Sequence, residues 1–208
     1  MATPTTHWQV DYDDPGPIRI RDPAAETLGV LPAGDPFVID YRDVVTHAGH
    51  SCPAASGGYR LSQVGLDALY PDELPVRSDV AVTAAGAEDQ HPYGVIAGVI
   101  SHVTGASDAR GFDGLGNGYG GRQDMLRFGG FDAEDVAFEF SRVDTHAAVR
   151  VTYHLGEVPR PDGLGLLPAV LKGSASEEDI QAFRNAWHGR VQTVLDSEDL
   201  FSVEWVAE

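Results

Sequence analysis

Cysteine is almost absent from this sequence: Cys52 is the only one among 208 residues. A single cysteine excludes a disulfide framework within the chain and any zinc module built on paired cysteines. If Cys52 has a chemical role, it acts alone, with histidines, or across an interface between two copies. The sequence also lacks an apolar run long enough to span a membrane. Residues 1–14 have neither the basic region nor the apolar core of a signal peptide, so we expect a cytoplasmic protein.

Lysine is equally rare. The chain has 32 acidic residues against 14 basic ones, of which Lys172 alone is a lysine, and its formal net charge is −18. We expect no nucleic-acid and no membrane partner, because binding to either depends on basic side chains that neutralise phosphates. The acids are interspersed with apolar segments, which argues against disorder. An acidic, lysine-poor surface fits a halophilic protein, since concentrated salt screens its self-repulsion. The charge therefore indicates a habitat and not a function.

The hydrophobic pattern predicts an α+β protein with a mixed β-sheet and helices packed on it. Residues 1–35 are expected to form an extended N-terminal arm, and residues 36–208 one α+β domain on which a helix and a strand from 155–208 pack. Four helices are predicted. The first follows Asp40 as its N-cap, and the second spans Pro53 to about Leu69. The third ends at Gly105, and the fourth begins at a capping box at Ser176. The predicted strands lie at 16–21, 78–86 and 201–208, with a hairpin over 136–158.

The stretch THAGHSCPAASGGYR, residues 46–60, surrounds the lone cysteine. Proline is favoured at the first helical position, so Pro53 places Cys52 at the N-cap, where free N–H groups and the helix dipole favour a thiolate. His50 stands two residues earlier, and thiolate with imidazole is a ligand set for zinc or another divalent transition metal. A lone cysteine also commonly packs as a small hydrophobic residue. From the spacing alone, both interpretations of Cys52 stay open.

A metal site needs a third ligand, and His91 in AEDQHPYG is the best candidate because it lies in a predicted strand-to-helix turn. Asp89 in the same turn is a candidate ligand, an acceptor for the N–H of a ligand imidazole, or a proton carrier. His47 is a second candidate proton carrier, and we expect it to line the pocket. Further candidate pocket residues are Tyr59, Asn117 and Arg122.

Asn117 and Arg122 belong to the glycine-dense loop GLGNGYGGR. This loop does not open a helix with G-x-G-x-x-G spacing and has no P-loop lysine, so we do not expect a phosphate site. Its glycines suit a backbone that closely approaches either a ligand, as part of a pocket wall, or a neighbouring helix. Arg122 could clamp a substrate carboxylate or pair with surface acids.

Several motifs together resemble the FmdE family, proteins similar to the FmdE component of formylmethanofuran dehydrogenase. Gly49, His50, Cys52 and Pro53 match the family's GHxCPG motif, with Ala54 in place of its last glycine. A TG turn at 104–105, the loop GLGNGYGG and the strand SRVDTHAAVRV follow at corresponding places. The resemblance covers about residues 36–155.

The resemblance implies a domain akin to the catalytic-type domain of glyceraldehyde-phosphate dehydrogenase, a frequent homodimer, and a metal, usually zinc, held by His50 and Cys52. His91 stands where the family's second cysteine begins a helix, which would replace a thiolate ligand by an imidazole. Ala106 stands where the family often has cysteine, and the C-terminal cysteine-rich zinc ribbon is absent.

Three functions follow as hypotheses. The first is a zinc-binding protein with a Cys52, His50 and His91 site facing a small-molecule pocket, in which Cys52 and Asp89 would take part in catalysis if it is an enzyme. The second is a metal-free enzyme with Cys52 as nucleophile. The third is an accessory or assembly subunit of a larger complex, which acts through its surface.

Overall fold

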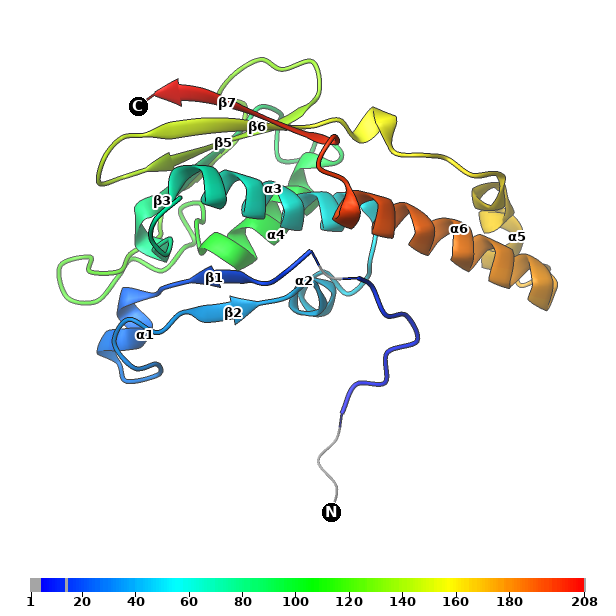
Figure 1. Ribbon diagram of the computed structural model, residues 1–208, viewed down its shortest axis with the longest axis horizontal. Helices are drawn as coiled ribbons and strands as arrows, with labels where there is room; N and C mark the ends of the chain where they lie inside the picture. Colours follow the sequence, from blue (N-terminus) through cyan, green and yellow to red (C-terminus); the bar gives the residue numbers. More distant parts are fainter. Residues whose placement is uncertain (1–4, 14, 208) are drawn as a thin grey trace.

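A five-stranded sheet forms one side of the fold in the computed structural model, which describes residues 5–13 and 15–207 (Figure 1). Its strand order is β4-β3-β5-β6-β7, and every neighbouring pair is antiparallel except β3 with β4. The strands are β3 (Val80–Ala84), β4 (Leu126–Arg127), β5 (Val136–Arg142), β6 (Ala148–Tyr153) and β7 (Phe201–Ala207). The protein therefore has the predicted α+β class and mixed sheet.

Alternating apolar residues hold the sheet to its helices. In the β5–β6 hairpin, Phe138 pairs with Val151 and Phe140 with Val149, and all four side chains are fully buried. Paired residues in antiparallel strands point to the same face, so the hairpin presents a continuous apolar surface. The prediction of a hairpin here is confirmed.

Helices α3 (Pro53–Leu69) and α4 (Tyr93–Thr104) pack together and against this sheet (Figure 1). Both match the predicted boundaries, with Pro53 at the first helical position of α3 and left-handed Gly105 (φ 77°) capping α4. Glycines in α3 allow the close packing: a Cβ on Gly57 would overlap the Tyr153 ring, and one on Gly58 would lie 2.9 Å from Val99 of α4. The small residues of the stretch 46–60 therefore serve helix packing.

A second, smaller layer covers α3 and α4 on the side away from the sheet (Figure 1). Strands β1 (Ile18–Ile20) and β2 (Phe37–Ile39) form an antiparallel ribbon, joined through α1 (Pro23–Thr27). Ile18, Ile20 and Ile39 are buried in the core. The predicted boundary at residue 35 thus falls between two paired strands, and part of the expected arm belongs to the core. Helix α2 (Tyr41–Ala48) follows β2, with Asp40 forming the predicted N-cap and a full capping box with Asp43.

The C-terminal region projects beyond the sheet (Figure 1). Helix α6 (Glu177–Asp196) begins at the predicted capping box of Ser176 and Asp179, and its far end is anchored by three buried residues, Val191, Val194 and Leu195. Helix α5 (Leu167–Leu171) and the 3₁₀ turns Leu155–Glu157 and Asp162–Leu166 connect β6 to α6; a third 3₁₀ turn, Arg77–Asp79, precedes β3. Among the described residues, no helix is both long and apolar enough to span a membrane.

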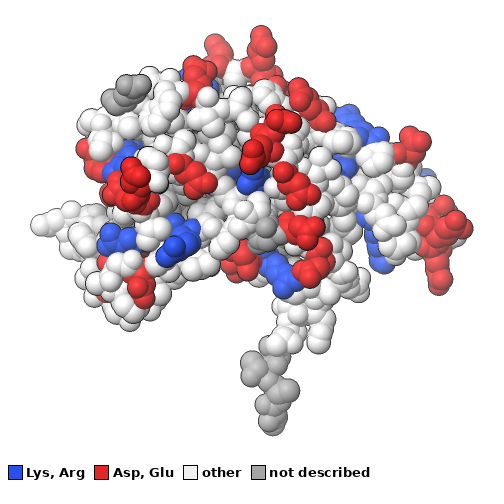
Figure 2. Space-filling view, viewed as in Figure 1, with Lys and Arg blue, Asp and Glu red and all other residues white. Residues whose placement is uncertain are grey.

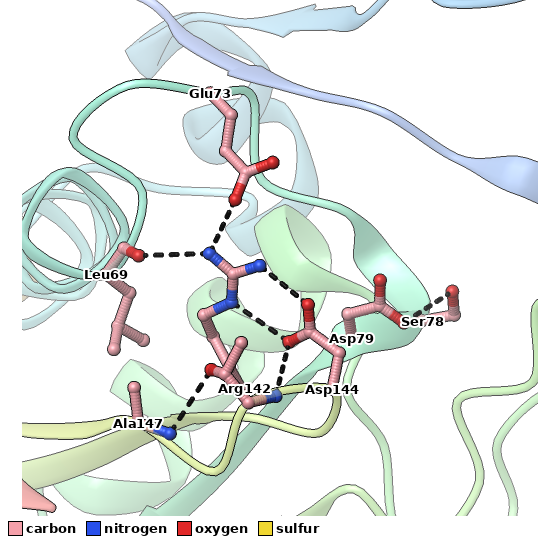
Figure 3. Close-up of polar contacts among 8 residues, drawn as sticks. Leu69, Glu73, Ser78, Asp79, Arg142, Asp144 and Ala147 are labelled. Carbon is pink, nitrogen blue, oxygen red and sulfur yellow. Dashed lines mark hydrogen bonds and ion pairs between the residues drawn. The ribbon is translucent and has the colours of Figure 1, made fainter. Parts of the chain in front are cut away.

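Arg142 closes the β5–β6 turn, and Figure 3 shows its contacts. Its Nε and Nη2 donate to the two oxygens of Asp144 at 2.9 and 2.6 Å, and Nη1 donates to Glu73 at 2.7 Å. The guanidinium also lies 4.2 Å from the ring centroid of Tyr70. These contacts raise the pKa of Arg142, first through the hydrogen bond to Asp144. The arginine and aspartate of the sequence SRVDTH therefore have a structural role: they fasten the hairpin to the chain that follows α3.

Candidate functional site

The loop between α2 and α3 places Cys52 at the start of α3, as predicted. Gly49 ends α2 in the left-handed conformation (φ 72°), which turns the chain, and Cys52 is the N-cap of α3. Its Sγ accepts a hydrogen bond from the N–H of Ala55 at 3.4 Å. The sulfur therefore lies at the positive end of the helix dipole, where negative charge is favoured.

Contacts from three elements, the preceding helix α2 and the distant α6 and β6, hold this loop in place. The Ser51 hydroxyl is hydrogen-bonded to Tyr41 of α2 at 2.9 Å, and the Ser51 carbonyl accepts from the indole N–H of Trp187 in α6 at 2.8 Å. Tyr153 of β6 donates to the carbonyl of Pro53 at 3.1 Å. The position of Cys52 is thus set by contacts from the sheet and from the C-terminal helix, and not by its own segment alone.

His50 is oriented by its own turn. Its Nδ1 lies 3.0 Å from the carbonyl oxygen of Ala48. A carbonyl oxygen only accepts, so Nδ1 carries the proton and Nε2 of the neutral ring keeps its lone pair. Metal-binding histidines commonly use this arrangement, in which a backbone carbonyl fixes the ring tautomer. His50 therefore has one nitrogen suited to a metal ion or a proton.

A cavity of about 360 Å³ brings the predicted metal ligands together. His50, Cys52 and His91 all line it, although His91 comes from the turn between β3 and α4. Pocket volumes in this range suit small molecules. The side chains are not gathered into a ready coordination shell: in the described part of the chain, no three His, Cys, Asp or Glu side chains lie close enough to hold an ion.

The remaining walls of the cavity are apolar or basic. They are formed by Pro53, Ala54, Val95, Leu155, Arg160, Trp187 and Arg190. None of the described residues that line it is acidic, whereas acidic side chains are spread over the face seen in Figure 2. The cavity therefore differs in charge from the surface of the protein.

Other candidates from the sequence lie outside this cavity. Asp89 is exposed and is not among its lining residues, so the structure does not place this carboxylate beside Cys52. His47 borders a different hollow, where its ring stacks on His102 with centroids 4.6 Å apart. Burial, with smaller contributions from His47 and Arg77, lowers the pKa of His102. His47 misses the cavity because it lies on the side of α2 that faces α4, which carries His102.

The three other predicted pocket residues also lie outside the cavity. Tyr59 is fully buried in the core, where its hydroxyl donates to the carbonyls of Gly16 and Ile39 at 2.9 and 3.1 Å. Arg122 forms an ion pair with buried Asp22 at 2.9 Å. Asn117 lies at an exposed position of the glycine loop. That loop therefore packs on α1 through the Arg122–Asp22 pair and forms no wall of this cavity.

The sequence analysis missed Arg160, Trp187 and Arg190. A local signal exists for two of them: Trp187 and Arg190 are three residues apart in a helix, so they share a face. Nothing in the sequence indicates that this face meets the Cys52 loop, since the contact between Ser51 and Trp187 joins residues 136 positions apart.

The comparisons with known proteins add no assignment. No protein-family model matches the chain, and no curated protein matches it significantly. Its function must therefore be argued from the cavity itself.

Proposed function

We propose that this protein binds zinc, or another divalent transition metal, through Cys52, His50 and His91 at a small-molecule cavity. The observation that carries the proposal is that these three side chains, from two separate segments, line one cavity. One thiolate and two imidazoles form a common zinc-binding set, and three protein ligands leave a position open for substrate or water. The proposal agrees with the resemblance to the FmdE family at residues 49–53.

The donor chemistry of these residues fits such an ion. The Nδ1 of His50 is occupied by the Ala48 carbonyl, which leaves Nε2 as the ligand atom. Cys52 presents its sulfur at a helix N-terminus. His50 and His91 are exposed, and the proposal requires that Nε2 of His50 and the ring of His91 come within bonding distance of an ion held on the sulfur of Cys52.

A bound metal would supply Lewis-acid chemistry, polarising a carbonyl or activating water. The chain itself would contribute the apolar walls, which exclude water from one side of a substrate. Trp187 holds the Cys52 loop through the Ser51 carbonyl and also faces the cavity. It would therefore fix the distance between the ligand loop and a bound molecule. Asp89 and His47 are outside the cavity, so we assign neither of them a catalytic role.

The test is the zinc content of protein purified without chelators. We expect close to one zinc per chain in the unaltered protein, and loss of that zinc in Cys52→Ala and in His50→Ala. His47→Ala is the matched control, because it removes a nearby histidine that lines a different hollow; its zinc content should be unchanged. An unaltered zinc content in Cys52→Ala would contradict the proposal.

A metal-free cysteine enzyme is the second candidate, favoured by the Ala55 N–H bonded to the sulfur. It predicts no zinc in any preparation and selective alkylation of Cys52 by iodoacetamide. The same preparations therefore separate the two functions.

A further inference from the structure

Two arginines in the cavity have no acidic partner. Seven of the other eleven arginines are ion-paired, as in Arg21 with Glu26 and Arg150 with Glu139, at 2.9 and 3.0 Å. Arg19, Arg60, Arg127 and Arg184 have no such partner among the described residues, but none of these four lines the cavity. Within residues 5–13 and 15–207, no carboxylate lies within salt-bridge distance of Arg160 or Arg190. The chain has a net charge of −18, so a shortage of acidic residues does not explain why these two arginines lack a carboxylate partner.

Arg190 is fixed in place by a bond that leaves the end of its side chain available. Its Nε donates to the carbonyl of Pro159 at 2.8 Å. This contact ties α6 to the segment that carries Arg160, so the two arginines are positioned together. In the described part of the chain, the terminal nitrogens of Arg190 have no hydrogen-bond partner in the protein. Two parallel N–H groups at the end of a guanidinium match the two oxygens of a carboxylate.

The electrostatic environment of Arg190 is that of an unneutralised cation. Partial burial and then the charge of Arg160 lower the pKa of Arg190, while Tyr153 and Cys52 raise it to a smaller extent. No described carboxylate is among these influences. Glu134 and Asp135 border a neighbouring hollow that shares Arg160 and His91 with the cavity but not Arg190. Two like charges in one site repel each other, and a bound anion would relieve that repulsion.

We propose that the cavity binds a small organic carboxylate, with its carboxylate group between Arg160 and Arg190 and its apolar part against Trp187 and Leu155. This inference names the substrate class of the same cavity. It rests on the proposed function, which identifies that cavity as the reactive site. The apolar walls favour a ligand with a hydrocarbon body over a free inorganic anion. The thiol of Cys52, at the same cavity, would then face the body of the ligand.

The fluorescence of Trp187 can report binding. Trp8 and Trp205 are 39% and 51% exposed, so a Trp8→Phe, Trp205→Phe background keeps the cavity tryptophan as the only one. We would titrate this protein with hexanoate and with its neutral isostere hexanamide, and we expect hexanoate to bind roughly tenfold more tightly or better. Arg190→Gln should reduce hexanoate affinity by about tenfold. Arg184→Gln is the matched control, because it removes the same charge from α6 outside the cavity.

Arg160→Gln should also weaken hexanoate, and neither cavity variant should alter hexanamide binding. The proposal is overturned if hexanamide or inorganic phosphate binds as tightly as hexanoate, if hexanoate does not bind, or if Arg184→Gln loses as much affinity as Arg190→Gln. The comparison of hexanoate with hexanamide on the arginine-containing protein decides the question even if a cavity variant fails to fold.

Each titration is run on zinc-loaded and on chelator-treated protein. Arginine-dependent hexanoate binding in a protein that never retains zinc would support this inference and remove the proposed metal function. Zinc bound through Cys52 without any hexanoate binding would support the metal function and overturn the inference of a carboxylate ligand.

Discussion

The arginine at the β5–β6 turn and the arginines at the cavity differ in what neutralises them. Arg142 is bonded to Asp144 and Glu73, and only 13% of its side chain is exposed (Figure 3). Arg190 donates to a backbone carbonyl and has another arginine, Arg160, as its charged neighbour. The first arrangement has its counter-charges within the protein, whereas the second has none among the described residues.

This contrast separates arginines that stabilise the fold from those available for binding. A side chain whose hydrogen bonds are all used inside the protein has little capacity left for a ligand. A partly buried cation without a partner costs stability, and proteins commonly retain such costs at functional sites. The two regions should therefore respond differently to the same kinds of substitution.

The largest expected difference is in the free energy of unfolding. Arg142→Met should lower it by about 1–2 kcal/mol, because two charge-assisted contacts and the packing on Tyr70 are lost, while the partial exposure of both acids limits the effect. Arg190→Met should change it by less than about 0.5 kcal/mol, since relief of repulsion offsets the lost Pro159 contact. Urea denaturation followed by circular dichroism measures both. Equal losses would remove the distinction between the two regions.

The next effect is on the dependence of stability on pH. Hydrogen bonds from Arg142 hold the pKa of Asp144 below its usual value. The resulting stability is present above the unfolded-state pKa of about 4 and is lost as the pH falls through the lower folded-state pKa. Asp144 is 44% exposed, so solvent screening should keep this contribution under about 1 kcal/mol.

Urea midpoints between pH 5 and pH 2 measure that loss. The unaltered protein should lose more stability over this range than Asp144→Asn does. Arg190→Met should follow the unaltered protein, because no carboxylate of the described residues is bonded to Arg190. A flattened profile in Arg190→Met would show that the cavity arginine has an acidic partner after all.

The smallest expected effect on stability comes from introducing a carboxylate side chain into the cavity wall near the two arginines. Val95 is 37% exposed and lines the cavity. Val95→Glu should raise the free energy of unfolding by a few tenths of a kcal/mol at most. It should also abolish hexanoate binding, because the glutamate carboxylate pairs with the cavity arginines in place of the ligand. Val95→Gln, of similar size but uncharged, is the control and should retain binding. Undiminished hexanoate binding in Val95→Glu would place the ligand elsewhere.

Features set by a few neighbouring residues could be predicted from the sequence. The start of α3 at Pro53, the N-cap at Asp40, the capping box at Ser176, and the end of α4 at Gly105 are all as predicted. Each depends on hydrogen bonds between residues within about four positions of one another, and the residue types that form such bonds can be recognised in the sequence. The two-residue strand β4 and the short helix α1 were not predicted, because their lengths carry too little periodicity to detect.

The candidate site was predicted in part. His50, Cys52 and His91 do share a cavity, but Tyr59 and Arg122 are held by Gly16, Ile39 and Asp22 in other parts of the fold. Their side-chain chemistry suits a pocket as well as a core or an ion pair. Only the packing of the surrounding elements selects between these uses.

By itself, the sequence determined the α+β class, the acidic surface and the position of Cys52 beside His50 at a helix start. These follow from composition, periodicity and capping, all of which are local or additive along the chain. Only the tertiary structure decided that His91 reaches the same cavity and that α6 brings Trp187 and Arg190 to it. Such distances between remote segments depend on which apolar faces pack together, as Gly57 against Tyr153 does here.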